Sequence, residues 1–230
     1  MAKNIKIQNL KKQRYIERIE LINHKYYIFC EGEQTEPRYF NTMKEYIEKN
    51  SIYKNMVFIE IEGCGVETMR VIESAEEYVR KNKITDGQVW CVYDKDSFPA
   101  ERFNGVSQRV KNLNAASTGV TYNVAWSNEC IEYWFVLHFS YYTSNNDRSY
   151  YREFLDEKLK ELGLPKYEKK DIFDILLQYG NPKLAIRYGK RRIAENEEKT
   201  DADIAPATKV YLLVEELAKF LPVDIKSKII

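Results

Sequence analysis

The sequence predicts an α/β protein built on a parallel sheet of about four strands that is covered by helices and followed by a helical C-terminal extension. Short, continuously apolar segments alternate four times with segments whose apolar residues recur at helical spacing. Each apolar segment ends at polar or glycine residues, as strands usually do. Strands that are apolar throughout are typical of parallel sheets, because such sheets are buried on both faces.

The elements follow one another in a regular order. The expected strands cover 26–30, 56–61, 89–93 and 120–126, and the expected helices cover about 35–47, 69–79, 100–115 and 131–137. Thr35, Glu36 and Pro37 predict the start of the first helix, with Thr35 as its N-cap. Ser127 and Asn128 are expected to cap the fourth. Further helices are expected at 150–162, 171–179, 182–196 and 207–221, with a mobile acidic loop between 195 and 205.

Charge and composition limit the function classes. The chain has 230 residues, of which 36 are basic and 35 acidic, so its net charge is +1. This balance excludes a globally cationic nucleic-acid-binding protein, and a basic surface must therefore be local. No apolar run approaches the ~20 residues that span a bilayer, and four widely spaced cysteines indicate reduced thiols. We therefore expect a cytoplasmic protein without a membrane partner.

The chain divides into three expected parts. Residues 1–24 form a basic arm, residues 25–140 form the α/β core, and residues 141–230 form a helical lobe packed on the core. The first 25 residues contain seven basic and two acidic side chains. Such an arm suits contact with nucleic acid or an acidic partner, and a solvated terminus is an equally good interpretation.

Acidic side chains follow the first and third strands. Glu31 ends the first strand, and Asp94 and Asp96 end the third. A flavodoxin-like strand order makes these two strands neighbours at the point where ligands bind. Residues two apart on a strand point to the same side, so both aspartates can face Glu31. Three uncompensated carboxylates repel one another, and a Mg2+ or Mn2+ ion would relieve that repulsion and could support phosphoryl transfer. Alternatively, these acids are ordinary turn and cap residues.

A second candidate is the helix that follows Pro182. Lys183, Arg187, Lys190 and Arg191 share one face of this helix. A nucleic-acid backbone would find several cationic contacts there. The alternative is a solvated helix face whose cations pair with the glutamates at 195, 197 and 198.

Three ordered blocks resemble the RloB family. They are YIFCEGEQTEPRYF at 27–40, VYDKDSF at 92–98 and SNECIEYWFVLHF at 127–139, and APATKV at 205–210 is similar to a C-terminal block of that family. The resemblance runs from about residue 26 to residue 221. It implies a Toprim-like (Rossmann-like) fold, a role in bacterial or archaeal defence against phage, and an ATPase partner protein.

The resemblance also implies roles for individual residues. Toprim domains hold Mg2+ with a glutamate after the first strand and a DxD motif after the third, which maps onto Glu31, Asp94 and Asp96. Related nucleases carry a further element after a later strand, which corresponds here to Ser127, Asn128 and Glu132. Many also use a lysine, for which Lys95 is the nearest candidate.

The leading hypothesis is a Mg2+- or Mn2+-dependent nuclease. Glu31, Asp94 and Asp96 would bind the metal, and Glu132 and Asn128 would help to orient metal, water or phosphate. DNA and RNA remain open as substrates. The rival hypothesis is a non-catalytic regulatory or sensing module that binds an ATPase partner or nucleic acid.

Overall fold

The computed structural model describes residues 24–117 and 119–230, and it confirms the α/β prediction. A mostly parallel sheet has the order β2-β1-β3-β4-β5. Its strands are β1 (His24–Cys30), β2 (Val57–Gly63), β3 (Gly87–Asp94), β4 (Val120–Asn128) and β5 (Ala207–Thr208). The first four strands pair in parallel, and β5 pairs antiparallel to β4. The expected neighbourhood of β1 and β3 is therefore confirmed.

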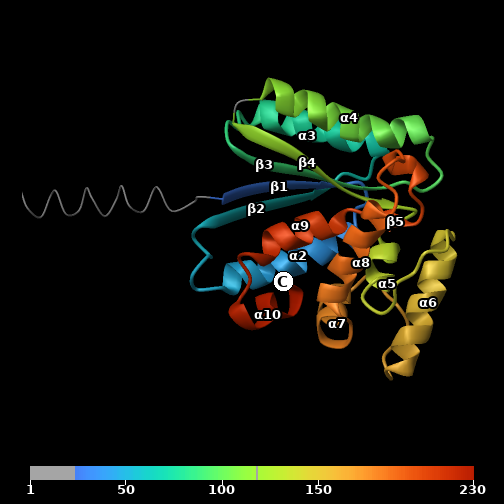
Figure 1. Ribbon diagram of the computed structural model, residues 1–230. Helices are drawn as coiled ribbons and strands as arrows, with labels where there is room; N and C mark the ends of the chain where they lie inside the picture. Colours follow the sequence, from blue (N-terminus) through green and yellow to red (C-terminus); the bar gives the residue numbers. More distant parts are fainter. Residues whose placement is uncertain (1–23, 118) are drawn as a thin grey trace, which may run out of the picture.

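Helices cover both faces of the sheet (Figure 1). Those between the first four strands are α2 (Thr35–Lys49), α3 (Thr68–Lys81) and α4 (Ala100–Ala116). Those that follow β4 are α5 (Glu132–Val136), α6 (Arg148–Glu161), α7 (Ile172–Tyr179), α8 (Pro182–Ala194), α9 (Val210–Ala218) and α10 (Val223–Ile229). In Figure 1, α3 and α4 lie above the sheet, and α2 and α9 lie below it.

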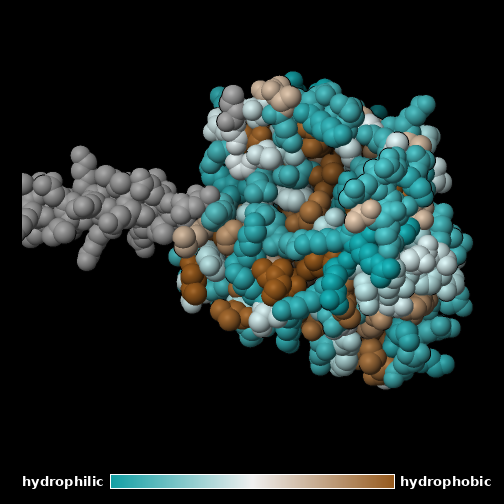
Figure 2. Space-filling model, viewed as in Figure 1, coloured by the Kyte–Doolittle hydropathy of each residue, from teal (hydrophilic) through white to brown (hydrophobic). Residues whose placement is uncertain are grey.

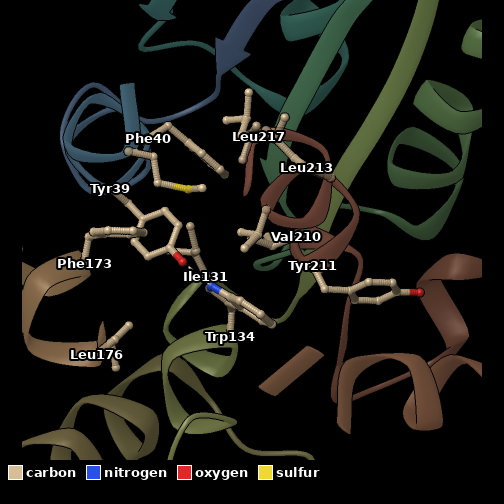
Figure 3. Close-up of a cluster of buried hydrophobic side chains, with 14 of the residues drawn as sticks. Tyr39, Phe40, Ile131, Trp134, Phe173, Leu176, Val210, Tyr211, Leu213 and Leu217 are labelled. Carbon is tan, nitrogen blue, oxygen red and sulfur yellow. Dashed lines mark hydrogen bonds between the residues drawn. The ribbon is translucent and has the colours of Figure 1, made fainter. Parts of the chain in front are cut away.

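Alternation along the strands divides the core into two clusters. In β1, Tyr26 and Ile28 pack on the side of α2 and α9, whereas Tyr27 and Phe29 pack on the side of α3 and α4. The larger cluster joins α2 to the C-terminal helices, as Figure 3 shows. There the indole Nε1 of Trp134 donates a hydrogen bond to Tyr39 Oη at 3.1 Å. This hydrogen bond allows a buried indole to be satisfied within an apolar layer.

The C-terminal section departs from the predicted helices at one important place. The helix predicted at 207–221 exists as α9 but starts later, at Val210, because Ala207 and Thr208 form β5, and it ends at Ala218. The Lys209 backbone N–H donates to Trp126 O at 2.7 Å, which continues the connection to β4. The C-terminal lobe thus contributes a strand to the sheet and is not helical throughout.

The acidic loop before β5 is fixed to the core. A 3-10 turn, η1 (Asp201–Asp203), places Asp201 where its carboxylate accepts hydrogen bonds from Ser107 Oγ at 2.7 Å and Trp126 Nε1 at 3.0 Å. Lys209 Nζ forms an ion pair with the other oxygen of Asp201 at 2.8 Å. These contacts join the loop that was expected to be mobile to α4, β4 and Lys209.

Two expected helix caps are also corrected. Thr35 is the first residue of α2, and the N-cap position falls on Gln34, which makes no side-chain cap hydrogen bond. Ser127 and Asn128 belong to β4, and the N-cap of α5 is Ile131. The N-cap of α2 thus lies one residue before the predicted one, and the N-cap of α5 lies three residues after Asn128.

The predicted basic arm at 1–24 lies outside the described residues except for His24, which begins β1. None of the helices in the described part combines the length and apolar composition that crossing a bilayer requires. The face shown in Figure 2 is mostly hydrophilic, and apolar side chains gather over α9 and α10.

Candidate functional site

A cavity of about 440 Å³ lies at the carboxyl ends of β1 and β3. Six acidic side chains line it, namely Glu31, Glu33, Glu36, Asp94, Asp96 and Glu132. Three cationic side chains from the C-terminal lobe complete it, namely Arg148, Arg152 and Lys169. This is the edge at which parallel α/β sheets bind ligands. The structure thus brings together four of the five predicted catalytic residues.

Glu31 is held directly against the end of β3. Its backbone N–H donates to Val92 O at 2.9 Å, which extends the β1–β3 ladder by one residue. Its Oε2 accepts from the Asp94 backbone N–H at 2.8 Å, and its Oε1 lies 3.4 Å from Thr68 Oγ1. Burial raises the pKa of Glu31 to about 7, and the charges of Asp96 and Glu36 act in the same direction. The two hydrogen bonds oppose that rise.

Asp94 and Asp96 come together through a turn and not through strand alternation. β3 ends at Asp94, and Asp96 follows in the left-handed region with a φ of 40°. Aspartate tolerates this conformation better than most residues, and such backbone strain is found at functional sites. The Lys95 N–H donates to Ser127 O and the Asp96 N–H to Glu129 O, at 2.8 and 3.0 Å, which anchors the turn on the segment after β4. The expectation that both side chains project from one strand face is therefore wrong, although both reach the cavity.

One arginine contacts both aspartates. Arg148 Nη2 lies 3.2 Å from Asp94 Oδ2 and 2.6 Å from Asp96 Oδ1. The Asp94 side chain is only 7% exposed, whereas that of Arg148 is 36% exposed. Burial raises the pKa of Asp94 well above its usual range, Glu36, Glu132 and Asp96 add to the rise, and Arg148 opposes it. The sequence suggested that the charges of these aspartates are uncompensated, but Arg148 compensates them in part.

Two further carboxylates are buried beside them. Glu36 packs against Gly32, where a Cβ would lie 2.6 Å from Glu36 Oε2, so a larger residue at position 32 would require the Glu36 carboxylate to shift. Burial raises the pKa of Glu36, and so does the charge of Glu132, whereas Arg148 and Lys169 lower it. Sequence reasoning explained Glu36 by the helix N-terminus alone and missed its place in the cavity.

Glu132 lies where the prediction required it, with a compensating partner. Its side chain is 2% exposed, and its Oε1 accepts a hydrogen bond from Arg152 Nε at 3.0 Å. Arg152 and Arg148 are one helical turn apart in α6, so both face the cavity. The i, i+4 spacing of two arginines was the sequence signal for this half of the site, and the prediction did not use it.

Three polar residues of the predicted motifs lie elsewhere. Asn128 donates from Nδ2 to Ala202 O and Ile204 O, at 2.9 and 3.1 Å, so it fastens the loop before β5 and does not line the cavity. Ser127 Oγ lies 3.1 Å from Thr208 Oγ1 in the β4–β5 pair. Lys95 Nζ lies 3.4 Å from Asp96 O and outside the cavity lining. The lysine that lines the cavity is Lys169, from the segment between α6 and α7.

The basic face of α8 exists as expected, but its cations differ in their partners. Lys183, Arg187, Lys190 and Arg191 are all exposed. Lys190 pairs with Glu215 at 2.6 Å, and Arg191 pairs with Glu195 at 2.6 Å and stacks on Tyr141. Within residues 24–117 and 119–230, Lys183 and Arg187 form no ion pair. These two cations are thus the ones with charge to offer a ligand.

The carboxylates suit a hard divalent cation in chemistry, although not as the side chains now stand. Among the described residues, no group of three or more His, Cys, Asp or Glu side chains is arranged to hold a metal ion. In this arrangement Arg148 binds both aspartates and Glu31 accepts a backbone N–H. Mg2+ needs only one or two carboxylates besides water and phosphate oxygens. A single cationic nitrogen already contacts both Asp94 and Asp96, so one cation can reach both carboxylates.

Comparison with known proteins gives one match. A family model described as "RloB-like protein" matches residues 26–217, which include every residue of the cavity. No curated protein and no solved structure matches the chain. The match covers most of the chain, from β1 to α9.

Proposed function

The chain belongs to the RloB-like family, and from that premise we propose that it is a metal-dependent nuclease with a Toprim-like active site. The observation that carries the proposal is the convergence of Glu31 with Asp94 and Asp96 in one cavity at the ends of two neighbouring strands. The proposed setting, prokaryotic defence against phage with an ATPase partner, rests on the family resemblance.

In this proposal Asp94, Asp96 and Glu31 would hold Mg2+ or Mn2+. The bound ion would stabilise negative charge on the oxygens of the phosphodiester during hydrolysis. Arg152 and Lys169 line the same cavity and would bind phosphate oxygens. Glu132 would keep Arg152 in place through their 3.0 Å hydrogen bond.

The direct test is cleavage of nucleic acid by the purified chain. Panels of single- and double-stranded DNA and RNA are incubated with Mn2+ or with EDTA. We expect Mn2+-dependent cleavage, and we expect Asp94→Asn with Asp96→Asn to reduce it by ~10³-fold, because loss of ligands removes the charge stabilisation that drives the reaction. Asp86→Asn, at an exposed ion pair with Lys25, is the control. Cleavage that persists in the double variant would refute the nuclease proposal.

The nucleic-acid-binding face makes a separate prediction. Lys183→Gln with Arg187→Gln should weaken binding to oligonucleotides and reduce the slope of log affinity against log salt by about 1–2, since two phosphate contacts are lost. Lys190→Gln is the matched control on the same helix, because Lys190 is already paired with Glu215. Fluorescence anisotropy at several salt concentrations gives both slopes. Equal slopes in the double variant and the wild type would contradict a role for this face.

The compensation of the cavity carboxylates favours one other function. Arg148 and Arg152 already neutralise Asp94, Asp96 and Glu132 in part. This arrangement is also compatible with a regulatory or sensing module that binds an ATPase or nucleic acid without catalysis. Calorimetry with Mg2+ and Mn2+ separates the two functions, because only the nuclease requires binding at millimolar metal or below. Absence of binding together with co-purification of an ATPase would favour the regulatory module.

A further inference from the structure

Arg148 is the first residue of α6 and reaches across the cavity to the end of β3. Its Nη2 contacts Asp94 and Asp96 together, so the guanidinium stands at the position between the two carboxylates that a shared cation would take. Glu36 and Glu132 add negative charge on the same side, and Arg152 and Lys169 are the other cations of the cavity. A divalent cation that bound both aspartates would therefore meet Arg148 directly.

The present position of Arg148 leaves part of its guanidinium unsatisfied. Its Nε is buried and has no hydrogen-bond acceptor among the described residues. A buried donor without an acceptor is unusual in a folded protein. An arginine otherwise binds carboxylate or phosphate with two parallel N–H donors. The observed contact uses only Nη2, so Arg148 has donor capacity that the aspartates do not use.

The Arg148 side chain is also partly open to solvent. Its side chain is 36% exposed and belongs to the first turn of a helix whose N-cap, Asp147, is satisfied by Ser149 and Tyr150. Reorienting this side chain would therefore not require that cap to open. The two aspartates, in contrast, are fixed by the backbone hydrogen bonds of their turn.

We infer that Arg148 is an exchangeable arginine: it neutralises Asp94 and Asp96 in the metal-free protein, and a divalent cation displaces it to a phosphate group of the substrate. The inference rests on the proposed function, because it needs both a cation and a phosphate ligand at this site. It assigns Arg148 two successive partners, and so it predicts opposite effects of one substitution on two ligands. If Arg148 had a purely structural role, its substitution would weaken the binding of both ligands.

The first measurement is Mn2+ binding by calorimetry in the full chain. Arg148→Gln should bind Mn2+ at least ~10-fold more tightly than the wild type, because the competing cation is gone. Lys169→Gln removes the same charge from the same cavity without touching the aspartates. It should change the Mn2+ affinity less than ~3-fold. Equal tightening in both variants, or none in Arg148→Gln, would overturn the inference.

The second measurement is binding of labelled DNA and RNA oligonucleotides in Ca2+ and in EDTA. In Ca2+, Arg148→Gln should bind the preferred oligonucleotide at least ~10-fold more weakly than the wild type. The reason is that the variant lacks the guanidinium that, in the wild type, the cation displaces towards phosphate. In EDTA the difference should be less than ~3-fold, since Arg148 is then held by the aspartates. A defect of the same size in both conditions would overturn the inference.

Asp94→Asn separates this inference from the proposed function. If the wild type binds Mn2+ and Asp94→Asn does not, but Arg148→Gln binds it as the wild type does, only the role of Arg148 fails. If neither the wild type nor Arg148→Gln binds Mn2+, both the metal site and the inference fail. Circular dichroism and thermal unfolding of each variant confirm that the compared proteins are folded.

Discussion

Replacing Glu31 with glutamine is expected to make the metal-free protein more stable at pH 8 while it weakens the metal site. Glu31 is largely buried, and its pKa is raised to about 7. At pH 8 the folded protein therefore carries a charge that burial disfavours. Glutamine removes this charge and retains a side-chain oxygen that can accept the Asp94 N–H. Because Glu31 is only partly shielded from water, we expect a gain of about 1–3 kcal/mol.

The direction of the pH dependence follows from the raised pKa. Between the unfolded value of about 4.5 and the folded value of about 7, the folded protein binds more protons at Glu31 than the unfolded chain. The contribution of Glu31 to stability is thus fully present below the unfolded pKa and is lost as the pH rises through 7. The advantage of Glu31→Gln should be near zero at pH 4.5 and largest above pH 7. Urea unfolding in EDTA at several pH values measures it.

A neighbouring carboxylate provides the control. Glu33 lines the same cavity and is exposed, so Glu33→Gln should change the unfolding free energy by less than ~0.5 kcal/mol. Millimolar Mn2+ should stabilise the wild type and Glu33→Gln more than Glu31→Gln, because a ligand stabilises only the protein that binds it. A loss of stability in Glu31→Gln at pH 8 would contradict this account.

The four parallel strands and the helices between them could be predicted from the sequence, because the apolar pattern of each segment agrees with its place in the fold. β1 and β3 are buried on both faces over most of their length, whereas the edge strand β2 carries exposed residues, and α2, α3 and α4 each pack one apolar face on the sheet. β5 could not be predicted in this way, since its two residues gain their strand character only by pairing with Ser127 and Asn128. A strand this short has no periodicity of its own.

The acidic side of the site was predicted from the sequence and the basic side was not, although Arg148 and Arg152 have i, i+4 spacing. Glu31 and Asp94 are fixed by strand ends, and the β1–β3 adjacency follows from a common strand order. Arg148 lies far along the chain from these residues and precedes the predicted helix start at 150. No local pattern states that α6 lies over the ends of the strands. That placement depends on tertiary packing, and so the compensation of the carboxylates became visible only in three dimensions.

Removing Arg152 is expected to be the most destabilising change at this cavity. Its Nε donates to Glu132 Oε1 at 3.0 Å, and the Glu132 side chain is 2% exposed. Arg152→Gln would leave a buried carboxylate without its cation. The loss of one partner from a buried ion pair lowers the free energy of unfolding by ~3–5 kcal/mol, because the other charge stays buried without compensation. Replacing both partners with neutral residues costs less. We expect a loss of that size at pH 8 in urea unfolding.

A double-mutant cycle separates the cost of an unpaired charge from the cost of a lost side chain. Glu132→Gln combined with Arg152→Gln removes both charges and should recover at least ~2 kcal/mol of the loss. Lys158→Gln is the matched control in α6, because its partner Glu161 is exposed, and it should cost less than ~1 kcal/mol. An Arg152→Gln variant as stable as Lys158→Gln would show that Glu132 does not depend on this ion pair. If the expected loss is found, the ion pair between Glu132 and Arg152 both positions a cation of the cavity and stabilises the packing of α6 on α5.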